Sequence, residues 1–237
     1  HFEAWTLLAA MGAQTKNATV SCLVHCMSYR NPALMSNMAK TMDHITNGRF
    51  VLGIGAGWNE EESDAYGIEL GSITERFDRF EEACQVLIGL LSQDTTDFDG
   101  RYFQLANARN EPKGPQRPHP PICIGGNGEK RTLRITAKYA DHWNFVGGTP
   151  QEFARKRDVL KAHCADVGRN PKDIMLSAHI RLSAERGARG VIEDAIALGA
   201  EGLDLAIIYL PLPYDPAVLE PLAETIRESG LWHPPAE

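Results

Sequence analysis

The part of the chain best suited to bind an anion is a glycine-rich turn, formed by Gly125, Gly126, Asn127 and Gly128. It follows an apolar run that is typical of a buried strand, and a helical pattern begins directly after it. Glycines let backbone N–H groups approach an anion closely, and the start of a helix adds a partial positive charge. The turn therefore predicts a phosphate site, although glycine-rich turns also follow strands for purely structural reasons. The spacing of a P-loop is absent from this segment.

A second group of glycines occupies alternate positions at the end of another apolar run: Gly53, Gly55 and Gly57, followed by Trp58. Glycine weakens the interior of a strand, so it often marks the close approach of a ligand or of another backbone. Three such positions would leave one face of the strand bare for a flat ring. Crowding inside a narrow barrel explains them equally well. The acidic run at residues 59–62 is best explained as the solvated start of a helix.

His25 and Arg30 lie near the end of the first predicted strand, where they could contact a substrate or a cofactor. Cys22 and Cys26 would share one face of this strand and His25 the other, so a cysteine–histidine metal pair is geometrically poor and no metal is expected. No G-x-S-x-G elbow occurs, and the cysteines lack the local context of a thiol nucleophile. Four further histidines fall within helix or strand patterns and are interpreted as structural: His44, His142, His163 and His179.

These residues must be positioned by an alternation of strand and helix patterns. Apolar runs predict six strands, at residues 19–27, 49–55, 121–125, 142–146, 175–182 and 203–209. Helical patterns cover residues 2–15, 32–46, 74–91, 130–139, 150–167, 190–198 and 216–229. Repeated βα units predict an α/β fold with a parallel sheet covered by helices. No flexible linker divides the chain, so residues 1–237 are expected to form one domain.

Two parallel architectures compete. A doubly wound dinucleotide-binding sheet would carry G-x-G-x-x-G, but Trp58 stands where the third glycine belongs. A (β/α)8 barrel fits the repeat, and its active site would lie at the carboxyl ends of the strands, although only six strands are counted. Residues 98–121 interrupt the repeat, because Asp99-Gly100 between Phe98 and Tyr102 predicts a small hairpin and prolines follow it.

Composition excludes several classes of protein. The chain has 237 residues with 31 acidic and 24 basic side chains, a formal net charge of −7. This acidity argues against nucleic-acid binding and against anionic membranes, which both favour a basic surface. No apolar run is long enough to span a membrane, and no charged-then-apolar N-terminal signal is present. The five cysteines include no CxxC pair, which favours reduced thiols and a cytoplasmic location.

Several segments, taken in order, resemble the luciferase-like family of flavin- and deazaflavin-dependent oxidoreductases. Each is weakly specific alone, but the series covers nearly the whole chain. The branch that it resembles most depends on coenzyme F420, a 5-deazaflavin. The segments are Tyr-Arg-Asn-Pro-Ala-Leu at 29–34, the stretch from Asp43 to Trp58, residues 62–67, Thr-Glu-Arg-Phe-Asp-Arg at 74–79, Gly-Arg-Tyr at 100–102, and residues 125–144.

The resemblance implies a TIM barrel with a hairpin insertion near residues 98–121. Residues 19–27 resemble the family's third strand, so strands 1 and 2 are missing from this sequence, which begins at His1 and is expected to be a fragment or to lack an N-terminal stretch. The family's proton-transfer residue would lie in the missing part, so the catalytic residue stays unknown. In light-emitting members an arginine that binds flavin phosphate follows the fourth strand. Ala56 stands at that place here, which favours a deazaflavin.

The resemblance also implies site residues. In the family the cofactor ring lies against a non-prolyl cis peptide, which falls at about Leu23–Val24 in this chain. The expected cofactor-binding residues are Leu23, Val24, Gly55, Gly125, Gly126, Asn127, Gly128 and Asn144. His25, Arg30 and Trp58 are expected to line the substrate pocket.

Three hypotheses of function follow. The first is an oxidoreductase that transfers a hydride between coenzyme F420 and a small organic substrate. The second is an FMN-dependent two-component monooxygenase, and the third is a truncated, non-catalytic barrel that binds flavin-like ligands or only a partner subunit. A homodimer is expected because dimers are common in the family, and a flavin or F420 reductase is a possible supplier of reduced cofactor.

Overall fold

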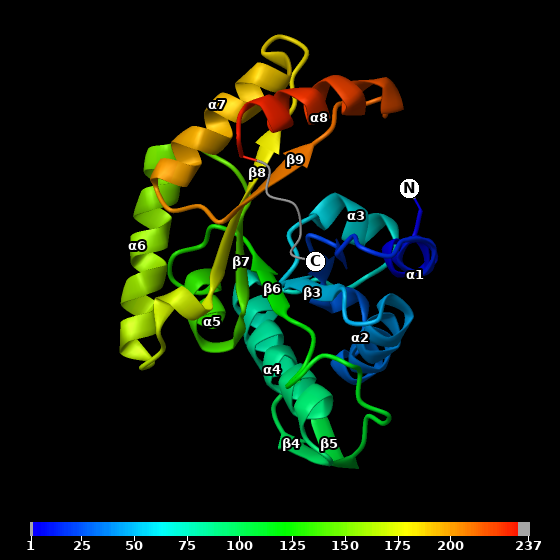
Figure 1. The fold of residues 1–237 in the computed structure, drawn as a ribbon. Coiled ribbons are helices and arrows are strands. Elements are labelled where there is room, and N and C mark those ends of the chain that lie inside the picture. The colour runs from blue at the N-terminus through cyan, green and yellow to red at the C-terminus, as the bar shows by residue number, and fades with distance from the viewer. Residues whose placement is uncertain (1, 232–237) are drawn as a thin grey trace.

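The central feature of the computed structural model, which describes residues 2–231, is a curled parallel sheet covered by helices (Figure 1). Its strands pair in the order β1-β3-β6-β7-β8-β9, and β2 also pairs with β3. Because β1 and β9 stand at the two ends of this path, the sheet is a partial barrel. The strands are β1 (Val20–Ser21), β2 (His25–Cys26), β3 (Phe50–Gly55), β6 (Ile122–Gly125), β7 (His142–Phe145), β8 (Met175–Arg181) and β9 (Leu205–Tyr209).

Helices follow the strands as the sequence predicts, and polar caps set where several of them begin. Asn31 caps α2, whose first residue is Pro32. Ser72 and Glu75 form a reciprocal capping box at the start of α4. The helices are α1 (Ala4–Gln14), α2 (Pro32–Thr46), α3 (Glu60–Ala65), α4 (Ile73–Ser92), α5 (Thr132–Tyr139), α6 (Pro150–Asp166), α7 (Gly187–Ala200) and α8 (Leu219–Glu228), with 3-10 turns at Met27–Tyr29, Pro171–Asp173 and Pro216–Val218.

The two halves of the sheet each pack against their own helices. Phe50 and Leu52 of β3 are buried with side chains of α1, α2 and α4. Trp143 of β7 and Ile180 of β8 are buried with side chains of α6, α7 and α8. Burial of these apolar side chains on the outer face of the sheet leaves the concave face available to other groups. Among residues 2–231, no helix combines the length and the apolar character that a membrane crossing requires.

The predicted hairpin insertion is confirmed. Strands β4 (Thr96–Asp99) and β5 (Gln104–Ala108) pair antiparallel beside the end of α4 (Figure 1). The Glu82 carboxylate on α4 accepts hydrogen bonds from three successive backbone N–H groups, those of residues 101–103, at 2.8–3.2 Å. This carboxylate holds the hairpin turn against the helix.

The prediction of one continuous strand over residues 19–27 is wrong. The segment contains two short strands, β1 and β2, with a cis Leu23–Val24 peptide between them, and a 3-10 turn already begins at Met27. The segment also approaches β3 very closely. A Cβ atom added to Gly53 would lie 1.9 Å from the Cys22 carbonyl oxygen. Regular pairing is therefore kept only at the two ends of the segment, with Val20 beside Phe50 and His25 beside Ile54.

Two predicted helices also differ at their ends. The predicted helix at 190–198 is longer and spans Gly187–Ala200. The predicted helix at 216–229 is divided into a 3-10 turn, Pro216–Val218, and α8. The acidic run at 59–62 does begin a helix, α3, whose N-cap Asn59 accepts a hydrogen bond from the Glu62 N–H.

Candidate active site

A cavity of about 1110 Å³ opens at the carboxyl ends of the parallel strands. This is the end at which barrel enzymes carry their active sites, and the volume suits a cofactor-sized ligand or a ligand pair. Its walls come from the segment 22–26, from the loops that follow β3, β6 and β7, and from the last residues of β8 and β9. The residues that line it include Leu23, Val24, His25, Arg30, Gly55, Ala56, Trp58, Glu62, Gly125, Gly126, Thr132, Asn144, Gly147, Gly148, His179, Arg181, Asp194 and Tyr209.

Two glycine turns stand side by side in this cavity. The first contains Gly125 and Gly126 at the end of β6, and the second contains Gly147 and Gly148 after β7. Gly126, Gly147 and Gly148 have φ values of 130°, 115° and 143°, which side chains other than hydrogen rarely permit. The sequence prediction singled out only the first turn, because the second is shorter and adjoins an ordinary helix start.

The donors available in these turns differ from the prediction. The Gly126 N–H already donates to the Asn144 carbonyl oxygen at 3.1 Å, so it is not free for an anion. The N–H groups of Gly147 and Gly148 donate to no group within residues 2–231. The buried Thr132, first residue of α5, adds its side chain to the same wall. The N–H groups of residues 127–132, between β6 and α5, likewise donate to no group within residues 2–231, so both turns carry free backbone donors.

Asn127 joins the two turns instead of lining the cavity. Its Oδ1 accepts from the Val146 N–H at 3.0 Å, and its Nδ2 donates to the Gly147 carbonyl oxygen at 3.3 Å. Gly128, the next residue, also lies outside the cavity lining, and its carbonyl accepts from the Leu133 N–H at the start of α5. Both residues therefore act by shaping the turns.

The alternating glycines of β3 are explained by crowding. A Cβ atom on Gly55 would lie 2.8 Å from the Val24 Cγ2 atom, and one on Gly57 would lie 2.4 Å from the Cys26 sulfur. Together with the contact of Gly53 described above, these distances show that the glycines admit the segment 22–26. Gly55 still borders the cavity, but the face that it leaves bare is filled by Val24.

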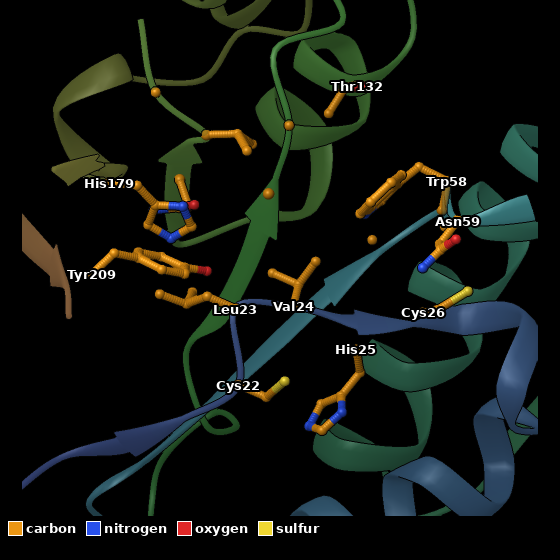
Figure 2. Close-up of a pocket in the computed structure, with 18 of the residues that line it drawn as sticks. Cys22, Leu23, Val24, His25, Cys26, Trp58, Asn59, Thr132, His179 and Tyr209 are labelled. Carbon is orange, nitrogen blue, oxygen red and sulfur yellow. The ribbon is translucent and has the colours of Figure 1, made fainter. Parts of the chain in front are cut away.

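Leu23 and Val24 form the middle of the cavity floor. Figure 2 shows them between Trp58 on one side and the pair His179 and Tyr209 on the other. The cis peptide bond joins these two residues. Val24 also packs under the β6 turn, since a Cβ atom on Gly125 would lie 3.1 Å from its Cγ1 atom.

The three predicted substrate-pocket residues occupy different surroundings. The His25 ring points away from Val24 (Figure 2) and stacks on Trp5 of α1 with ring centroids 4.4 Å apart. Burial, helped by the nearby Arg30 charge, lowers the pKa of His25 to about 4, so the ring is neutral at pH 7. Arg30 pairs with Glu3 at 2.5 Å. Trp58 stands at the rim with 82% of its surface exposed.

Polar side chains line the concave face of β7 and β8. Asn144 donates through Nδ2 to the Ser177 hydroxyl at 2.9 Å, and Ser177 is also hydrogen-bonded to His142 Nε2 at 2.6 Å. Burial lowers the pKa of His142 to about 4. This network fixes the Asn144 side chain at the cavity wall, where the resemblance placed a cofactor contact.

His179 is the residue that sequence reasoning missed. The sequence pattern predicts a structural role for it, yet His179 lines the cavity and meets Tyr209 edge to face, with ring centroids 4.5 Å apart. Its Nε2 is buried and has no hydrogen-bond partner within the described part of the chain. The signal was present in the alternation of β8, where Ser177, His179 and Arg181 share one face.

Residues 2–231 contain no group of three or more histidine, cysteine or acidic side chains that could hold a metal ion.

Comparison with known sequences gives one family. Residues 1–219 match the family described as luciferase-like monooxygenase. The chain is 32% identical over 217 residues to a protein named pyrimidine monooxygenase RutA from Stutzerimonas stutzeri, covering 85% of this chain and 59% of that relative. It is 29% identical over 214 residues to the phthiodiolone/phenolphthiodiolone dimycocerosates ketoreductase of Mycobacterium bovis, covering 85% of this chain and 55% of that one. The chain thus spans less than two thirds of the length of these curated relatives.

Solved structures agree on the fold. The coenzyme F420-dependent tetrahydromethanopterin reductase from Methanopyrus kandleri superposes with a TM-score of 0.82 at 13% identity, covering 97% of this chain and 87% of that chain. The long-chain alkane monooxygenase LadA superposes with a TM-score of 0.83 at 15% identity, covering all of this chain and 75% of that one. At these identities the likeness concerns the fold alone.

Proposed function

Because the chain belongs to the family of luciferase-like monooxygenases, we propose that it is an oxidoreductase that transfers a hydride between coenzyme F420 and a small organic substrate. The observation that carries the proposal is the pair of glycine turns at the cavity wall. Their free N–H groups, at Gly147 and Gly148, form a place where a phosphate can be held without a cationic side chain. The cavity also has room for a ring and a substrate side by side.

The residues present fit such a cofactor. Because Gly126 has no side chain, the β6 turn can approach a phosphate closely, beside the Thr132 side chain. The backbone N–H groups of Gly147 and Gly148 can donate hydrogen bonds to that phosphate. Leu23 and Val24 give an apolar support for a flat ring. When bound, the cofactor supplies the ring carbon that accepts or gives the hydride. The protein would hold ring and substrate in contact and keep bulk water from the reacting atoms.

The second candidate is an FMN-dependent monooxygenase that receives reduced flavin from a separate reductase. It is favoured by the named activity of the pyrimidine monooxygenases, to which the chain is 32% identical. Ala56 favours the deazaflavin, because it brings no charge to the end of β3, where light-emitting members are expected to carry an arginine.

We also propose a homodimer as the working assembly.

Anaerobic titration of the full-length protein with F420 and with FMN, followed by absorbance, tests the choice. We expect F420 to bind at least tenfold more tightly than FMN, and reduced F420 to be oxidised when a carbonyl substrate is supplied. Tight FMN binding with reductase-dependent oxygen uptake from NADH would overturn the deazaflavin assignment. The variant Gly168→Asp, whose glycine lies outside the cavity lining, is a control for the folded state.

A further inference from the structure

The carboxyl ends of β8 and β9 present a short ladder of side chains to the cavity. The two strands pair in parallel, with Arg181 beside Tyr209 and His179 beside Ile207. Side chains of a strand alternate between its faces, and Ala178 and Ile180 are buried among the helices. His179 and Arg181 therefore share the concave face, with Arg181 one step nearer the rim.

Of the charged side chains that line the cavity within residues 2–231, one cation has no partner. Glu3 pairs with Arg30 at 2.5 Å, and Asp194 pairs with Arg186, which lies outside the cavity, at 2.8 Å. Arg181 lines the cavity and forms no ion pair or side-chain hydrogen bond with any residue between 2 and 231. A fifth charged side chain, Glu62, lies across the cavity and accepts a hydrogen bond from the Tyr29 hydroxyl at 2.9 Å. Among the described residues the cavity thus has one cation without an acidic partner, Arg181 on the β8 side, and one carboxylate without a cationic partner, Glu62.

Aromatic surface lies directly beside this cation. The His179 and Tyr209 rings meet edge to face, and 44% of the Tyr209 surface is exposed. Burial, with the Arg181 charge as a second cause, lowers the pKa of His179, so at pH 7 the imidazole adds no charge of its own. A flat or apolar body can pack on these rings while an attached anionic group reaches the guanidinium.

We propose that Arg181, His179 and Tyr209 form the substrate subsite, and that the substrate is an organic carboxylate whose apolar or aromatic body packs on the two rings. This inference rests on the proposed function, because it assigns the substrate to the part of the cavity that the cofactor leaves. The glycine turns follow β6 and β7, whereas Arg181 ends β8, so the two anion sites belong to different strand ends.

The test uses benzoate and its neutral isostere benzamide as probes, titrated calorimetrically into the full-length protein. Because a hydrogen bond to a charged group is among the stronger ones, we expect benzoate to bind about tenfold or more tightly than benzamide. Arg181→Gln should remove this difference, and Arg181→Lys should restore part of it. Tyr209→Leu should weaken the binding of benzoate and of benzamide by the same factor. Arg189→Gln is the matched control, because Arg189 is exposed on α7, lies outside the cavity and forms no ion pair with any residue from 2 to 231.

Titrations with F420 and FMN on the same variants separate this inference from the proposed function. We expect Arg181→Gln to change the affinity for either cofactor less than twofold. If Arg181→Gln left benzoate binding unchanged while F420 still bound, the subsite would be wrong and the proposed function would stand. If Arg181→Gln weakened the binding of both cofactors tenfold, Arg181 would hold the cofactor phosphate and the subsite assignment would be overturned. Absence of cofactor binding to the unmodified protein would instead contradict the proposed function.

Discussion

Removing the Asn127 side chain tests whether the two glycine turns act as one unit. Asn127→Ala deletes the hydrogen bonds to the Val146 N–H and to the Gly147 carbonyl, which measure 3.0 and 3.3 Å. Both are partly accessible to water, so each contributes near the lower end of the usual range. We expect the free energy of unfolding to fall by about 1–2 kcal/mol. The freed β7 turn must then be ordered when a ligand binds, which should weaken cofactor binding roughly tenfold.

The measurements are urea unfolding and titration with F420 and FMN. Asn170→Ala is the control, because Asn170 caps the 3-10 turn before β8 through a bond of similar length and lies far from the turns in sequence. It should lower stability by about 1 kcal/mol and leave cofactor affinity unchanged. If Asn127→Ala lost stability while the affinity for both cofactors stayed the same, the turns would not hold the cofactor, and the argument from Gly147 and Gly148 would fail.

Three further changes have defined outcomes. Gly53→Ala should destabilise the fold by more than about 3 kcal/mol or prevent folding, because the added Cβ atom would lie only 1.9 Å from a carbonyl oxygen. The control is Gly199→Ala, which replaces a helical glycine with open space around it and should stabilise the fold by up to about 1 kcal/mol. Chemical denaturation of the two variants compares their free energies of unfolding. Burial lowers the pKa of His25 to about 4, so its ring is neutral in the folded state at pH 7. The free energy of unfolding should therefore be highest above pH 6.5 and fall by up to about 3 kcal/mol as the pH drops to 4. His25→Gln should flatten this pH profile, and an unchanged profile would contradict the argument from burial. Gly126→Asp places a carboxylate in the turn and should weaken F420 binding at least tenfold relative to Gly168→Asp. If the chain were a non-catalytic barrel that binds only a partner, the two variants would have the same affinity for F420.

Local signals explain why much of the fold could be predicted from the sequence. The caps of α2 and α4 are short-range interactions, so Asn31, Ser72 and Glu75 locate the helix starts without tertiary information. The hairpin also depends on neighbouring residues, since the Asp99-Gly100 turn joins β4 and β5. The division of residues 19–27 was not predictable in this way, because it follows from contact with β3.

The site was predicted only in part for a similar reason. The turn at Gly126 was visible as a glycine cluster, but its N–H is used by Asn144, a residue on the next strand. His179 looked like an isolated histidine in a strand pattern. Its role depends on Tyr209, a strand away, and on which face of the sheet is concave. Both features are set by the pairing of strands that lie far apart in the sequence, so a local pattern does not predict them.

A crystal structure of the protein with bound F420 tests the central claim most directly. We predict that the cofactor phosphate lies within hydrogen-bond distance of the N–H groups of Gly147 and Gly148, beside Thr132, and that the deazaflavin ring packs on Leu23 and Val24. A cofactor bound with its phosphate at Arg181, or with its ring outside the cavity, would contradict the account.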